Sequence, residues 1–184
     1  MKSIFTLIIL FIGFLLSSCS FHLRNAQSFS PELNNLYFNS DKPFNVVSTQ
    51  LRSLLESNQL HLAKKESDAR FSLVISDDVF SYSRPDVVNA SLPTTMNFIQ
   101  TATATIEDNL THKTIISQTF STTQSLTLNA NQIYTADSND FMKRELTRNM
   151  VSLIYYWLIS TNTKEAVHHA IRTKRIKKTV SHQR

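Results

Sequence analysis

The most reactive side chain of this 184-residue sequence is a single thiol. Cys19 stands in the stretch LLSSCSFHLR, directly after an unbroken apolar run, and the chain has no second cysteine. One cysteine cannot form an internal disulfide, a CxxC redox pair or a cysteine-rich zinc site. Any chemistry at Cys19 is therefore the chemistry of one thiol acting alone.

The residues before Cys19 have the parts of a signal peptide. Lys2 supplies the positive end, an apolar block follows, and Ser17 and Ser18 are the small residues at the cut. The apolar block is shorter than the roughly 20 residues that a transmembrane helix needs, so a membrane-spanning leader is the second interpretation. Residues 1–18 are thus predicted to be a cleaved leader.

The four residues Leu16 to Cys19, LSSC, resemble the bacterial lipobox. In that motif the cysteine sulfur takes a diacylglycerol, and cleavage then frees the cysteine amine for a further acyl chain. We predict lipidation of Cys19, because two or three acyl chains hold a protein on a membrane almost permanently. The alternative is that Cys19 is only an apolar residue of the leader. Ser20, by resemblance to sorted lipoproteins, favours transfer to the outer membrane.

Glycine and histidine usage bound the remaining chemistry. Gly13 is the only glycine and leaves with the leader, whereas P-loop and Rossmann turns need glycines, so nucleotide sites of those kinds are excluded. We expect no other cofactor either. Apart from His22 beside the anchor, the predicted domain contains only His61 and His112, and neither has the nucleophile and orienting acid of a hydrolase evident nearby. The adjacent histidines His168 and His169 lack the spaced third ligand of a zinc site. We expect no catalytic residue, no metal and no enzyme activity.

The positive charge is concentrated at the C-terminus. The formal net charge is +5, but residues 163–184 carry seven basic side chains against Glu165 alone, which leaves the body of the chain nearly neutral. Such a segment is predicted to be a solvated, disordered tail. The alternative is attraction to a surface of phosphate-bearing lipids. Nucleic acid is not an expected partner of an exported, lipidated chain.

Hydrophobic periodicity predicts two helices and at least four strands. One helix should begin near Pro43, with Ser40 and Asp41 as cap candidates and an apolar stripe through Val47 and Leu51. The other should span Asn139 to Ile159, with Asp137 and Ser138 as cap candidates. Its core stripe is predicted as Met142, Leu146, Met150, Leu153 and Trp157, widened by Phe141, Ile154 and Leu158. Residues 33–39, 71–82, 95–106 and 114–126 read as strands, and residues 60–63 as a possible short one.

Two of these strands carry further signals. The alternation from Phe71 loses its parity after Asp77, which predicts a bulge there. Along residues 95–106 the apolar side chains alternate with a ladder of threonines, which suits a sheet with one wet face. The order β-α-β-β-β-α predicts an α+β two-layer sandwich over residues 19–162, with a mainly antiparallel four-stranded sheet and two helices on one face.

The start of the mature chain, Cys19-Ser20-Phe21-His22-Leu23-Arg24, is similar to the Cys-Gly-aromatic-His-Leu-Arg start of the lipopolysaccharide-assembly lipoproteins of the LptE family. The resemblance continues through LRSLLESNQ and FMKRELTRNM and covers about residues 19–160, with Ser20 in place of the usual glycine. It implies a lipid-anchored protein on the periplasmic side of the outer membrane. There such proteins plug the lumen of the LptD β-barrel, help it to assemble and assist lipopolysaccharide to reach the outer leaflet.

The same resemblance gives one candidate for lipopolysaccharide binding. Arg84 follows the second long strand, near where the family places a basic residue thought to face lipid, whereas the corresponding position on the fourth strand holds Gln118. Arg84 as a solvated loop residue is the alternative. Two other functions stay open: a generic envelope lipoprotein that docks another secretion or cell-wall machine, and a lipid-anchored hydrolase acting through His61 or His112.

Overall fold

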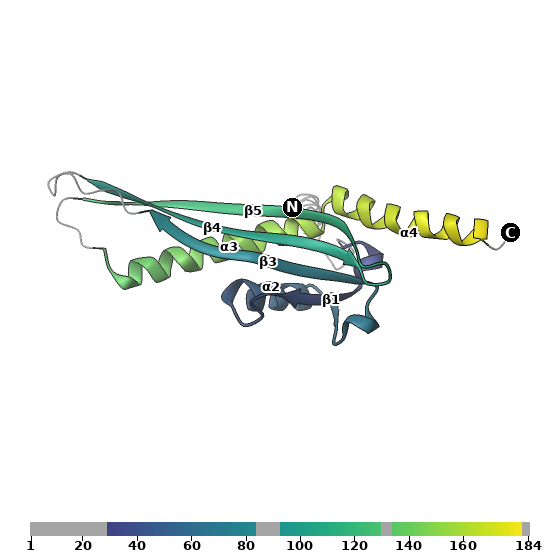
Figure 1. Ribbon diagram of the computed structural model, residues 1–184. Coiled ribbons are helices and arrows are strands. Elements are labelled where there is room, and N and C mark those ends of the chain that lie inside the picture. The colour runs from purple at the N-terminus through teal and green to yellow at the C-terminus, as the bar shows by residue number, and fades with distance from the viewer. Residues whose placement is uncertain (1–28, 84–92, 130–133, 182–184) are drawn as a thin grey trace, which may run out of the picture.

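The computed structural model describes residues 29–83, 93–129 and 134–181, with side chains of the last range described as far as Arg172. Cys19 and Arg84 lie outside these residues. The described elements, drawn in Figure 1, are η2 Pro31–Leu33, β1 Asn35–Ser40, α2 Val46–Ser57, β2 His61–Ala63, η3 Glu66–Asp68, β3 Phe71–Ser83, β4 Thr94–Asp108, β5 Lys113–Leu128, α3 Ala136–Leu158 and α4 Thr161–Ser181.

The strands of the described residues form one sheet in the order β2-β1-β3-β4-β5. β1 runs parallel to both β2 and β3, whereas β3, β4 and β5 are antiparallel neighbours. The α+β class is therefore confirmed, with the short segment near residue 61 adding a fifth strand to the four expected. Figure 1 shows β3, β4 and β5 as a long blade with α3 running along it and α2 beside β1.

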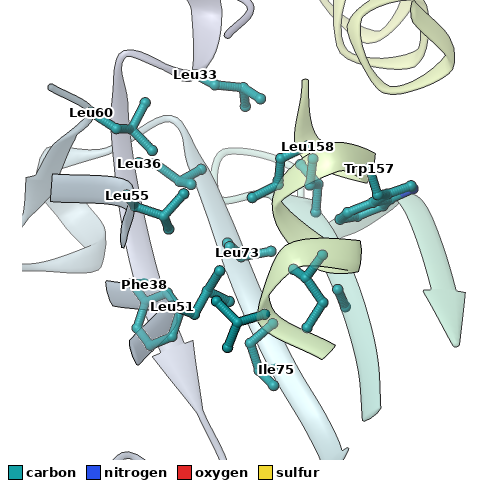
Figure 2. Packing of buried hydrophobic residues seen from close by; sticks show 14 of the residues in the cluster. Leu33, Leu36, Phe38, Leu51, Leu55, Leu60, Leu73, Ile75, Trp157 and Leu158 are labelled. Carbon is teal, nitrogen blue, oxygen red and sulfur yellow. The ribbon is translucent and has the colours of Figure 1, made fainter. Parts of the chain in front are cut away.

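The main core lies between α2, α3 and the sheet. Alternate residues of β1 and β3 point to the same face of the sheet, so Leu36, Phe38, Leu73 and Ile75 meet the helices there. The apolar stripe of α2 reaches the same space from the other side, and Figure 2 shows Leu51 lying close to Ile75. Full burial of each such side chain contributes about 1.5–3 kcal/mol to folding.

The bulge expected in β3 is present. The register between β3 and β4 shifts between Ser76 and Val79, and Asp77 adopts a left-handed backbone with φ 53°. An extra residue on one strand turns the side chains that follow it to the other face. The bulge therefore brings Phe80 and Tyr82 to the same face of the sheet as Leu73 and Ile75.

The helices differ in detail from the sequence prediction. α2 begins at Val46 behind Asn45, whose side chain accepts from the Ser48 amide, and α3 begins at Ala136 behind Thr135. Ser40 and Asp41, and Asp137 and Ser138, are therefore not the caps, because the helices start at other residues. In α3 the stripe of Met142, Leu146, Met150, Ile154, Trp157 and Leu158 is buried as expected.

Two apolar residues of α3 are exposed, contrary to expectation. Leu153 is 41% exposed and Phe141 51% exposed. Thr147 and Val151 occupy buried positions instead, because the buried stripe follows the straight 3.6-residue period through Thr147, Val151, Ile154 and Leu158. The prediction was wrong at these positions because it weighed residue type above angular position.

The C-terminal segment forms helix α4, not a solvated tail. Ser160 starts the helix, accepting at Oγ from the Thr163 amide, and Thr163 donates its hydroxyl to the Trp157 carbonyl at 2.8 Å. Val167 is fully buried and Ile171 packs on the main core. One face of the helix packs on the core, because Thr163, Val167 and Ile171 recur every four residues. The positively charged Lys164 and Arg172 lie on a neighbouring face. Among the described residues, no helix has the length and hydropathy to cross a bilayer.

Candidate functional site

The structure describes several residues that sequence analysis singled out for possible chemistry, among them His61, His112 and Gln118. His61 is exposed on β2 and His112 is exposed in the β4–β5 turn. Within the described part of the chain, no group of three or more His, Cys, Asp or Glu side chains is placed to hold a metal. Arg84 comes directly after Ser83, the last residue of β3, and Gln118 is an exposed residue of β5 on the helix side of the sheet, opposite Ala104.

The face of the sheet turned away from the helices carries rows of hydroxyl groups. Hydroxyl pairs cross from β4 to β5 at Thr95 and Thr127 (3.0 Å), at Thr103 and Thr119 (3.0 Å), and at Thr105 and Ser117 (2.7 Å). These are directly opposed residues of the antiparallel ladder. We call this surface of β3, β4 and β5 the hydroxyl face.

Apart from Asp77 in the bulge, whose carboxylate accepts from Ser76 Oγ at 3.1 Å, the paired residues of the hydroxyl face between Thr95 and Thr105 carry no formal charge. From Thr95 to Thr105, each outward residue of β4 is Thr, Asn or Ile, and each partner on β5 is Ser or Thr. The partners on β3 from Ser83 to Val74 are Ser or Val. A protein surface of this size ordinarily mixes charges of both signs. A hydroxyl surface can hydrogen-bond a polar partner without the large desolvation cost of buried ions.

The free end of the blade carries a cluster of aromatic rings. Phe98 lies between Phe80, Tyr82 and Tyr134, with ring centroids 5.8–6.3 Å apart. Buried Met96, Met142 and Leu146 complete this second core, which is separate from the main one. Tyr82 is 41% exposed and lies two residues before Arg84 in the sequence. The end of β3 thus places apolar surface next to a basic residue in the chain.

A buried polar layer separates the two cores. Gln100 is 2% exposed; its Nε2 donates to Asp78 Oδ1 at 2.9 Å, and its Oε1 accepts from Thr147 Oγ1 at 3.2 Å. Asp78 also accepts from Asn45, and Lys42 donates to its main-chain oxygen at 2.6 Å. The layer borders a cavity of about 280 Å³, which Lys42 and Lys143 also line. Sequence analysis missed this layer, although Gln100 is the one break in the apolar alternation of β4.

A second hollow lies where the described chain begins. A groove of about 540 Å³ separates the first turns of α4 from the segment Phe29 to Glu32, and it is lined by Phe29, Ser30, Pro31, Glu32, Lys164, Glu165, His168, His169 and Arg172. Ser30 Oγ donates to the Glu32 carboxylate. This hydrogen bond, with smaller effects of a backbone hydrogen bond and of the nearby His168, holds the pKa of Glu32 below its ordinary value of 4.5, against an opposing effect of burial.

Comparison with known proteins places the fold. No protein-family model matches the chain, and no curated protein matches its sequence. The structure is similar to an uncharacterized lipoprotein B from Nitrosomonas europaea, with a TM-score of 0.61 and 15% identity over 82% of this chain and 96% of that one. It is also similar to a minor lipoprotein from Acinetobacter baumannii, with a TM-score of 0.53 and 19% identity over 69% and 91% of the two chains. At these identities the likeness shows a shared fold.

Proposed function

We propose that this protein is an outer-membrane lipoprotein of the LptE type. It is anchored through acyl chains on Cys19, stands in the lumen of the LptD β-barrel, and helps that barrel to assemble and to pass lipopolysaccharide to the outer leaflet. Support comes from three directions: the lipobox and the hexamer that follows it, the fold shared with two proteins described as lipoproteins, and the hydroxyl face of the sheet.

The hydroxyl face is the observation that carries the proposal. A barrel lumen is lined by alternate residues of its strands and is polar. A plug that fills such a lumen needs a long, narrow surface whose polar groups can be satisfied by many partners. β5 has 16 residues, about 53 Å at 3.3 Å per residue, and its outward side chains along the hydroxyl face are Ser and Thr. In this proposal the face contacts the barrel wall by hydrogen bonds.

Lipopolysaccharide would meet the free end of the blade. Its phosphates require basic side chains and its acyl chains require apolar surface. Arg84 follows β3, which ends beside the aromatic cluster around Phe98. We therefore keep Arg84 as the phosphate ligand in this proposal, because it follows Tyr82 by two residues in the sequence and the Tyr82 ring contacts that of Phe98.

Co-purification tests the proposal. The protein should be recovered from outer membranes after crosslinking with LptD as its main partner, and its depletion should lower surface lipopolysaccharide. Mass spectrometry should find the mature chain beginning at an acylated Cys19. Recovery of a different secretion or cell-wall machine as the main partner would instead support the generic docking lipoprotein. An unmodified sulfur with the leader still attached would overturn both.

A further inference from the structure

Helix α4 presents two different rows of side chains. The row of Thr163, Val167 and Ile171 packs on the main core. The neighbouring row, one residue further along, is Lys164, His168 and Arg172, and these three side chains line the groove opposite Phe29 to Glu32. Residues four apart in a helix lie one above another. The groove is thus bordered by a straight row of cationic or ionisable nitrogen groups.

The rest of α4 continues this charge. The sequence of Thr161–Ser181 holds six Lys or Arg residues against Glu165 alone. Two carboxylates also line the groove, Glu32, which accepts from the Ser30 hydroxyl, and the exposed Glu165, so the excess of positive charge belongs to α4 as a whole and not to the groove alone. Figure 1 shows α4 leaving the sheet and continuing past the β4–β5 turn, so most of the helix is free of the sheet.

The predicted anchor lies within reach of this helix. The described chain begins in the groove at Phe29, ten residues after Cys19. Ten residues span at most about 33–36 Å, and the 21 residues of α4 are about 31 Å long. A protein held on a membrane through Cys19 therefore keeps the groove within about 33–36 Å of the lipid surface, a distance similar to the length of α4.

We propose that α4 and its groove bind the phosphate groups of anionic phospholipids in the leaflet that carries the anchor, with Lys164, His168 and Arg172 as the described ligands. This rests on the acylation of Cys19 proposed above. Each Lys or Arg close to an anionic surface strengthens binding by several-fold. The acyl chains hold the protein on the membrane, and α4 sets its orientation there, so that the hydroxyl face is turned to a partner and not to lipid.

Vesicle binding tests this with the full chain carrying Cys19→Ser, which cannot be acylated. Flotation with vesicles of phosphatidylcholine alone is compared with vesicles of equal parts phosphatidylcholine and phosphatidylglycerol. We expect phosphatidylglycerol-dependent binding that Lys164→Gln with Arg172→Gln weakens by about tenfold or more. The matched control is Arg144→Gln with Arg148→Gln on α3, which removes the same charge and should weaken binding by about twofold at most. The leader is identical in every variant, so differences between variants report on the helices.

A second measurement reads the groove itself. The ring signals of His168 in NMR spectra should shift on addition of a short-chain phosphatidylglycerol and not on addition of inorganic phosphate alone. Equal weakening by the two charge-removing pairs, no weakening by the groove pair, or an equal His168 response to free phosphate would each overturn the proposal. The assay contains neither the LptD barrel nor an acylated Cys19, so its outcome is distinct from failure of the proposed function in the mass spectrum or the co-purification.

Discussion

Gln100 and Asp78 are joined by a hydrogen bond of 2.9 Å from Nε2 to Oδ1, across the step where the bulge shifts β3 against β4. The same amide accepts from Thr147 of α3 at 3.2 Å. One buried side chain of β4 therefore ties the bulge of β3 to helix α3. It lies between the two apolar cores, where a buried polar group is costly unless it is paired.

Removing this amide should destabilise the fold. Gln100→Leu leaves the Thr147 hydroxyl without its acceptor and takes a donor from Asp78, so we expect a loss of about 1–3 kcal/mol in the free energy of unfolding. Adding Thr147→Val should recover part of it, because a removed pair costs less than one orphaned group. Urea unfolding measures both. Thr103→Val, at a partly exposed position of the hydroxyl face, is the control and should change stability by about 0.5 kcal/mol or less. A Gln100 variant no less stable than this control would contradict the structure.

Replacing Gln59 by glycine should stabilise the protein. Gln59 lies just beyond the end of α2 and has φ 63°. Its amide donates to the Glu56 carbonyl, and the Leu60 amide donates to the Leu55 carbonyl, which together form a Schellman motif. A non-glycine residue with this left-handed backbone destabilises the folded state by about 1–2 kcal/mol. Glycine removes this strain, but part of the gain is lost because glycine also raises the conformational entropy of the unfolded chain. We expect a gain of up to about 1 kcal/mol, measured by thermal unfolding.

The neighbouring residue serves as the control for Gln59→Gly. Asn58 has φ −90°, and its side chain donates to the Leu54 carbonyl and accepts from Tyr155. Asn58→Gly should therefore lower the melting temperature. Equal effects of the two changes would show that the left-handed backbone at Gln59 is not the cause.

The pH dependence of stability should contain a contribution from Glu32. Its pKa is lowered in the folded state, mainly by the Ser30 hydroxyl. A lowered pKa stabilises the fold above the ordinary value of 4.5, and this is lost as the pH falls through the lower folded value. Ser30→Ala should therefore cost less than about 1 kcal/mol at neutral pH, because solvent screens this partly exposed carboxylate, and the cost should shrink as the pH falls below 4.5. Denaturant titrations at neutral pH and well below pH 4.5 decide it. A cost that is the same at both would show that the hydroxyl acts only by packing.

The sequence predicted the parts of the fold that depend on periodicity. The inward residues Phe98, Ala102 and Ala104 of β4, the bulge at Asp77 and the stripe of α3 all follow from alternation or helical spacing, which burial enforces strongly. β2 has three residues and was weaker as a signal for that reason.

What the sequence did not reveal depends on pairings between distant residues. Gln100 looked like a gap in an apolar pattern, because its partners Asp78 and Thr147 lie 22 and 47 residues away. Helix α4 was missed because its apolar residues are sparse, and two of them are held by the core that α2 and α3 form. The groove could be found only once α4 and the segment at Phe29 were placed together.

The hydroxyl face should tolerate charge in the free protein and not in the complex. Thr119→Lys puts an ammonium at the centre of this face, where contact with a barrel wall would bury it at high cost. We expect an unchanged melting temperature and a strong loss of LptD in crosslinked co-purification. The matched control is Gln118→Lys. Gln118 is the preceding residue of the same strand and is exposed on the opposite side of the sheet. Equal recovery of LptD with both variants would remove the hydroxyl face from the proposal.

Arg84 should matter for lipopolysaccharide and not for the fold. An arginine pairs with phosphate through two parallel hydrogen bonds, and a charge-assisted bond contributes about 1.5–3 kcal/mol. Arg84→Glu should thus weaken lipopolysaccharide binding by about tenfold or more, whereas Arg84→Lys should retain most of it. The readout is retention of lipopolysaccharide by the purified protein, with Arg144→Glu on α3 as the control for net charge. If Arg84→Glu binds as well as that control does, Arg84 is a solvated residue after β3, and direct contact with lipopolysaccharide must be sought elsewhere.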